Sequence, residues 1–140
     1  MEDEDDERTG TFAMRKPPNT EKRVLVVDDS EVIADTLAMV LSAEGFHAVA
    51  SYSAADALKL LQSESFDVLI SDVMMPGMTG MELAMDVARR RAVRAVLLMS
   101  GVAGTADLLE NARKLGYSFE ILAKPAYTTD VIKKIQQLLA

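Results

Sequence analysis

Three carboxylates, one hydroxyl and one amine follow short runs of apolar residues along the chain. The acids are Asp28, Asp29 and Asp72, the hydroxyl belongs to Ser100, and the amine belongs to Lys124. If these runs are strands of one open parallel sheet, their carboxyl ends share the edge where such sheets bind ligands. Three carboxylates at close range repel one another, and a hard cation such as Mg²⁺ relieves that repulsion. The residue types therefore predict a magnesium site.

A phosphoryl group is the natural substrate of such a site. A cation held by two or three protein oxygens keeps bound waters, which phosphoryl oxygens can replace. Lys124 would add charge and Ser100 a hydrogen bond to the remaining oxygens. A carboxylate can then act as the nucleophile and form an aspartyl phosphate. Asp72 stands alone after its apolar run, so we expect it to be phosphorylated, whereas the adjacent pair Asp28 and Asp29 suits metal binding.

The segments that must position these residues alternate in pattern from residue 23 onward. Five short apolar runs are typical of strands covered on both faces, at residues 24–27, 47–50, 68–71, 95–99 and 119–122. Between these runs, apolar residues recur at helical spacing. We expect helices to start after Ser30 and after Ser53, and a third helix from about Met81 to Arg90. Two further helices are expected around residues 108–115 and 131–139. This alternation predicts a single doubly wound α/β fold with a five-stranded parallel sheet, without choosing between the two common strand orders.

Taken together, the motifs resemble the receiver domains of two-component response regulators. The matching segments are residues 24–30, residues 72–80, Ser100-Gly101 and Lys124-Pro125, in the family's order and near its spacings. Any one of these motifs alone would be weak, and the resemblance covers about residues 23 to 140. It implies the strand order 2-1-3-4-5 of flavodoxin-like and CheY-like folds and a magnesium-dependent phosphorylation switch.

The resemblance also implies individual roles around the metal. Asp72 is similar to the family's phospho-acceptor and contributes to the metal site. Asp29 resembles the acid that binds the metal directly, and Asp28 the acid that assists through water. The backbone carbonyl of Met74 would be a further ligand.

Two more roles and one departure lie on the other strands. Ser100 matches the switch hydroxyl that moves toward the phosphoryl group, and Lys124 matches the phosphate-binding lysine, whose bond to Pro125 is often cis in the family. The family often has Tyr or Phe three residues before this lysine, where the present chain has Ile121. The departure concerns signal output through a rotating aromatic ring and leaves the phosphorylation chemistry unaffected. Tyr117 or Phe119 is a weaker candidate for that ring.

The resemblance implies protein partners rather than substrates to be turned over. The expected donor is a sensor histidine kinase or a phosphotransfer protein, and the expected recipient is a downstream target protein. The sequence ends one residue beyond the last periodic residue, Leu139, so we expect a stand-alone receiver that is a monomer or a weak phosphorylation-dependent dimer. Its only catalysis would be its own aspartyl phosphorylation and dephosphorylation. The alternative is a phosphorylation-independent receiver-like interaction module, which the five site residues disfavour and Ile121 mildly favours.

Charge and composition argue against a nucleic-acid-binding, membrane or secreted protein. The formal net charge is −7, but six of the 22 acidic residues lie within residues 2–7, and the other 16 nearly balance the 15 basic residues. We therefore expect a disordered acidic arm over residues 1–20, a receiver domain over residues 21–140 and no direct binding of nucleic acid. No apolar run approaches the roughly 18 residues of a membrane span, and the acidic start is unlike a secretion signal, so a cytoplasmic protein without membrane contact is expected.

Other chemistries fit the sequence less well. The chain has no cysteine, which excludes thiolate metal sites and cysteine nucleophiles. An FMN-binding flavodoxin would need a hydroxyl-rich and glycine-rich loop where Asp28 and Asp29 stand. A haloacid-dehalogenase-type phosphatase needs a second acid two residues after its nucleophile, where Ser30 and Met74 occur instead. The lone His47 begins an expected strand and is a weak candidate for a phosphorelay donor.

Overall fold

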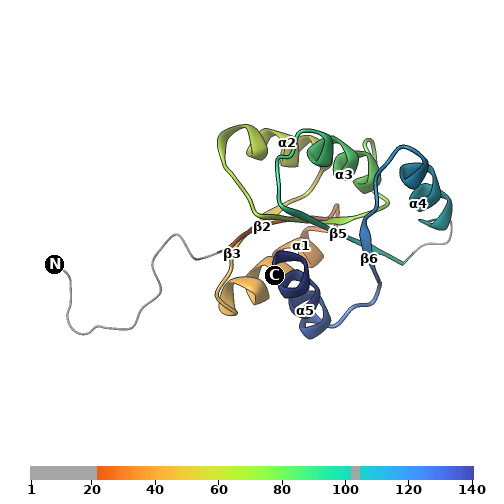
Figure 1. The fold of residues 1–140 in the computed structure, drawn as a ribbon. Coiled ribbons are helices and arrows are strands. Elements are labelled where there is room, and N and C mark those ends of the chain that lie inside the picture. Colours follow the sequence, from red (N-terminus) through yellow and green to blue (C-terminus); the bar gives the residue numbers. More distant parts are fainter. Residues whose placement is uncertain (1–21, 102–104) are drawn as a thin grey trace, which may run out of the picture.

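Five parallel strands form one sheet, and each strand is followed by a helix (Figure 1). The computed structural model describes residues 22–101 and 105–140, so the predicted acidic arm over residues 1–20 lies outside the described residues. The order β3-β2-β4-β5-β6 places the second strand of the chain at one edge, and this confirms the predicted order 2-1-3-4-5 and the doubly wound α/β fold. The strands are β2 (Arg23–Val27), β3 (His47–Ser51), β4 (Val68–Asp72), β5 (Ala95–Ser100) and β6 (Glu120–Ala123).

Helices cover both faces of this sheet (Figure 1). One layer holds α1 and α5, and the other holds α2 and α3 with α4 packed beside α3. The helices are α1 (Glu31–Ala43), α2 (Ala54–Ser63), α3 (Gly80–Arg89), α4 (Thr105–Lys114) and α5 (Thr128–Leu139). Among the residues that the structure describes, no helix is both long and apolar enough to cross a membrane.

The two helical layers explain why the central strands are apolar at consecutive positions. In β2, Val24 and Val26 pack against α1 and α5, whereas Leu25 and Val27 pack against α2 and α3. All four are at most 2% exposed. Since successive side chains of a strand point to opposite faces, a strand buried on both faces must be apolar throughout.

Hydroxyl side chains begin three of the helices. Ser30 accepts a hydrogen bond from the N–H of Ile33 at 3.4 Å, and Ser53 caps α2 as expected. The third cap was missed from the sequence: Thr79 and Glu82 form a reciprocal capping box. This box starts α3 at Gly80, one residue before the predicted start, and so fixes the end of the loop that follows β4.

The strand ends also differ slightly from the sequence-based expectation. Asp72 is the last residue of β4 and Ser100 the last residue of β5, where the predicted strands stopped one residue earlier. The fifth strand begins at Glu120 and ends at Ala123, one residue later than predicted at both ends. Asp72 and Ser100, which the sequence predicts for the site, are therefore part of the sheet.

Candidate functional site

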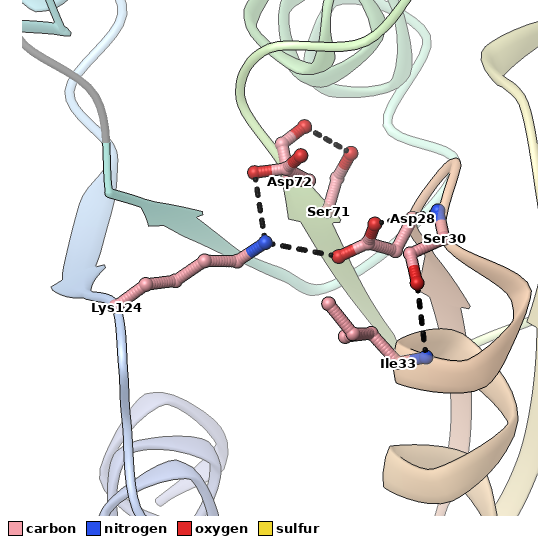
Figure 2. Close-up of polar contacts among 6 residues, drawn as sticks. All are labelled: Asp28, Ser30, Ile33, Ser71, Asp72 and Lys124. Atoms are coloured by element: carbon pink, nitrogen blue, oxygen red, sulfur yellow. Dashed lines mark hydrogen bonds and ion pairs between the residues drawn. The ribbon is translucent and has the colours of Figure 1, made fainter.

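Strand register brings the predicted site residues together at the carboxyl edge of the sheet (Figure 2). Val27 of β2 is paired with Ser71 of β4, so the next residues, Asp28 and Asp72, emerge side by side. On the other side, the pairing of Ser100 with Ala123 brings the following residue, Lys124, to the same edge. Neighbouring strands lie about 5 Å apart, so Asp28 and Asp72 emerge close together, whereas β6 lies two strands beyond β4 and the long side chain of Lys124 crosses the remaining distance.

The three acids form a cluster with the dimensions of a metal site. One carboxylate oxygen from each of Asp28, Asp29 and Asp72 lies within 4.8 Å of the other two. Asp28 is buried at 5% exposure, Asp72 is partly buried and Asp29 is exposed, so the cluster opens to solvent on the Asp29 side. Hard oxygen ligands at this spacing fit Mg²⁺, which retains waters at its remaining positions. Met74 follows in the loop after β4, with its side chain 43% exposed.

Lys124 joins two of the three acids. Its Nζ lies 3.1 Å from Oδ2 of Asp28 and 3.3 Å from Oδ1 of Asp72 (Figure 2). The base of its side chain passes close to Gly101, where an added Cβ would lie 3.2 Å from the Cβ of Lys124. The peptide bond between Lys124 and Pro125 is cis, in agreement with the expectation from the family. One ammonium group therefore offsets part of the charge of the acid pair.

Asp28 is held from both sides. Its Oδ1 accepts a hydrogen bond from the backbone N–H of Ser30 at 2.9 Å, while its Oδ2 faces Lys124. The N–H of Asp28 in turn donates to the carbonyl of Ser51 on β3. A carboxylate fixed by charge-assisted hydrogen bonds to both oxygens has little freedom to act as a nucleophile.

Burial and charge affect the two key titrating groups differently. Burial raises the pKa of Asp72, the attraction of Lys124 lowers it, and the charges of Asp28 and Asp29 raise it again, so the pKa of Asp72 lies above its ordinary value. For Lys124, burial lowers the pKa, but the hydrogen bond to Asp28 and the charge of Asp72 outweigh it and raise the pKa. Lys124 therefore stays charged, while the carboxylate of Asp72 lies close to the negative charges of Asp28 and Asp29. A second cation at the cluster would relieve that repulsion.

Two residues outside the predicted site hold the backbone of Asp72. The hydroxyl of Ser71 is fully buried and donates to the carbonyl of Asp72 at 3.0 Å (Figure 2). At Gly80, an added Cβ would lie only 1.8 Å from that same carbonyl oxygen. A polar residue inside an otherwise apolar strand was the available sequence signal for Ser71. Gly80 was quoted in the motif, but its close approach to Asp72 requires the folded loop.

Ser100 and Ile121 lie on the two strands beside the acids. Ser100 is 7% exposed, and its carbonyl accepts the N–H of Lys124 at 2.9 Å. Ile121 is half-buried and packs on the layer of α3 and α4. Tyr117 and Phe119, which precede β6, stack on one another with ring centroids 6.0 Å apart. An aromatic pair therefore lies near the position where the family often has one ring, but outside the strand.

Comparison with known proteins agrees with this geometry. The family model for the response regulator receiver domain matches residues 24–136 of this chain. Chemotaxis protein CheY4 of Vibrio cholerae is 28% identical, with a TM-score of 0.74, over 84% of this chain and 98% of that one. The response regulator TrrA of Thermotoga maritima, in complex with Mg²⁺ and BeF, is 26% identical with a TM-score of 0.71 over 84% and 98%.

A third similar structure is the signal receiver domain of an HD domain-containing protein from Pseudomonas fluorescens Pf-5. It is 27% identical, with a TM-score of 0.77, over 85% of this chain and 94% of that one. The family match covers well over half of the chain, and the strand order and the acid cluster at the carboxyl edge agree with it. The chain belongs to the response regulator receiver domain family of two-component signalling.

Proposed function

We propose that Asp72 accepts a phosphoryl group while Mg²⁺ is held by Asp28, Asp29 and Asp72, with the backbone carbonyl of Met74 as a further ligand. The observation that carries the proposal is the position of Lys124, whose Nζ lies within 3.3 Å of carboxylate oxygens of both Asp28 and Asp72. A lysine held at that point can contact a phosphoryl oxygen as soon as one is attached to Asp72. Bound Mg²⁺ would neutralise phosphoryl charge and orient the group for in-line transfer.

The transfer balances without further reactants. A carboxylate oxygen of Asp72 attacks the phosphorus of a phosphohistidine, the new O–P bond forms, and the P–N bond to the donor imidazole breaks. The leaving imidazole nitrogen keeps the electron pair of the P–N bond and takes up a proton from solvent water, which gives neutral histidine. Lys124 stabilises charge on the equatorial oxygens, and the Ser100 hydroxyl donates to one of them once the group is in place. Hydrolysis of the aspartyl phosphate by water returns the resting state.

The partners follow from this chemistry. The donor is a sensor histidine kinase or a phosphotransfer protein, and a downstream target protein recognises the phosphorylated surface. The Thermotoga relative is a response regulator in complex with Mg²⁺ and BeF, and this supports the proposal that the present chain binds Mg²⁺ together with a phosphoryl group. The present chain is then a signalling switch whose catalysis is limited to its own aspartyl group.

The test is the intact mass of the protein after incubation with acetyl phosphate and Mg²⁺. We expect one added phosphoryl group on the wild-type chain, none on Asp72→Asn and none after chelation of the metal. Asp107→Asn is the matched control, because it removes an exposed acid from α4 and should leave the adduct unchanged.

Rapid hydrolysis could hide the adduct, so binding of beryllofluoride is measured in parallel by the change in amide NMR signals around the site. If neither the adduct nor a beryllofluoride response is found, the proposal is wrong. The phosphorylation-independent interaction module, which Ile121 favours, would then be the better description.

A further inference from the structure

A second concave site lies at the opposite edge of the sheet, beneath the amino ends of β5 and β6. Its volume is about 430 Å³, and its polar lining comes from Arg91, Arg94, Ser118 and Glu120. Arg94 directly precedes β5, and its backbone N–H is fixed by the carbonyl of Asp67 at 2.9 Å. This pocket contains none of the residues of the phosphorylation site.

The pocket has an excess of positive charge. Its one acid, Glu120, is already paired with Lys134 at 3.2 Å. Arg91 and Arg94 are both exposed, and neither guanidinium group has a hydrogen bond or ion pair within residues 22–101 and 105–140. Each guanidinium group presents a planar fork of N–H donors that matches the two oxygens of a carboxylate.

The backbone of Arg91 adds an independent observation. The preceding Arg89 and Arg90 are both paired with Asp86 on α3. Arg91 stands just beyond the end of that helix with a φ of 54°, the left-handed conformation for which glycine is preferred. A side chain at such a position costs about 1 kcal/mol. The chain therefore presents a guanidinium group at a site where glycine would be the more stable choice.

The chain itself contains a matching acidic segment. Residues 2–7 are all Asp or Glu. The described chain begins at Lys22, just before β2, and β2 starts on the same edge of the parallel sheet as β5 and β6. The start of β2 is two strands from β5, or about 10 Å. The 15 residues that separate position 7 from position 22 can span up to about 50 Å when extended.

We propose that the acidic segment of residues 2–7 binds the pocket formed by Arg91, Arg94 and Ser118. Its carboxylates pair with the two guanidinium groups. The tether gives the segment an effective concentration in the millimolar range, which makes weak ion pairs sufficient. The interaction occupies the amino edge and leaves the phosphorylation site at the carboxyl edge accessible.

The absence of cysteine makes a single spin label possible. A nitroxide is attached to Thr9→Cys, and paramagnetic broadening of the amide NMR signals is measured. We expect strong broadening at residues 91–96 and 118–120 and none at Asp29 on the opposite edge. Neutralising the segment by changing all six acids to their amides, or adding about 1 M salt, which shortens the screening length to about 3 Å, should abolish it.

The pocket variant is Arg91→Gly with Arg94→Gln, in which the glycine suits the left-handed backbone and maintains folding. It should lose the broadening at both segments, while its other amide signals stay in place. Uniform broadening, broadening centred elsewhere, or broadening that survives this variant would overturn the proposal. Mixing spin-labelled unenriched protein with unlabelled ¹⁵N protein tests a second copy as the occupant: broadening in that mixture at the level of the single chain would also overturn it.

Discussion

The carboxyl edge and the amino edge of the sheet carry charges of opposite sign, and only at the carboxyl edge are these charges paired within the site. At the carboxyl edge, Asp28, Asp29 and Asp72 surround Lys124, which pairs with two of them. At the amino edge, Arg91 and Arg94 line a pocket whose acid is paired elsewhere. A charge with a partner inside the site is held in position, whereas an exposed charge without a partner is available to a ligand of opposite sign. The carboxyl edge therefore combines the paired Lys124 with three acids at the spacing of a metal site, and the amino edge combines two arginines with a pocket.

Removing the charge of Lys124 should have the largest effect on phosphorylation. Lys124→Met deprives the transferring phosphoryl group of its charged partner, and we expect the rate of phosphorylation by acetyl phosphate to fall about 10²-fold to 10³-fold. Binding of Mg²⁺ should become tighter, because one positive charge leaves the acid cluster. Lys133→Met, on the exposed side of α5, is the control. A phosphorylation rate that matches wild type, together with tighter Mg²⁺ binding, would show that Lys124 only balances charge in the resting state.

The backbone of Asp72 lies in close contact with Gly80 of α3. Gly80→Ala places a Cβ 1.8 Å from the carbonyl oxygen of Asp72, so the loop must shift. We expect the free energy of unfolding to fall by about 1 to 3 kcal/mol in urea titrations. Gly101→Ala, whose Cβ would meet Lys124 at 3.2 Å, is the comparison and should lose less. Equal losses would mean that the contact at Asp72 is easily relaxed.

The acid cluster also predicts a pH dependence in the absence of metal. The pKa of Asp72 is raised above 3.8 by burial and by the neighbouring acids, so the folded state keeps a proton that the unfolded chain has released. The stability contributed by protonated Asp72 is therefore lost as pH rises from the ordinary carboxyl value through the raised one.

Urea unfolding in chelator at several pH values checks this prediction. Asp72→Asn should lack that fall in stability, so the difference between the variant and wild type should move in the variant's favour as pH rises. A difference that stays constant across this range would contradict the raised pKa.

The sequence was sufficient for the approximate positions of the elements and for the expectation that Asp28, Asp29, Asp72 and Lys124 share one edge of the sheet, because both depend on local pattern. The apolar run of β2 and the position of Asp72 after the third run are visible without a structure. The strand order needed the family resemblance, since alternation of strands and helices is compatible with two orders.

The contacts between site residues could not be predicted from local sequence pattern. Lys124 and Asp28 are 96 positions apart along the chain, and their ion pair depends on register across β2, β4, β5 and β6. The buried hydroxyl of Ser71 and the close approach of Gly80 to Asp72 likewise appear only when the loop after β4 has folded back. The residue types were predictable, and the contacts that constrain them were not.

The smallest effect is expected at the amino edge. Arg91→Gly removes a side chain from a residue with a φ of 54°, so the folded state gains about 1 kcal/mol from relief of the left-handed conformation. The greater freedom of glycine in the unfolded chain offsets part of that gain. In about 1 M salt, which screens the proposed pairing with residues 2–7, we expect a net increase in the free energy of unfolding of about 0.5 kcal/mol, with phosphorylation of Asp72 unchanged. A loss of stability at that salt concentration would contradict the relief of backbone strain. At low salt the gain should be smaller, and repeating the urea titration with residues 2–7 neutralised should restore it.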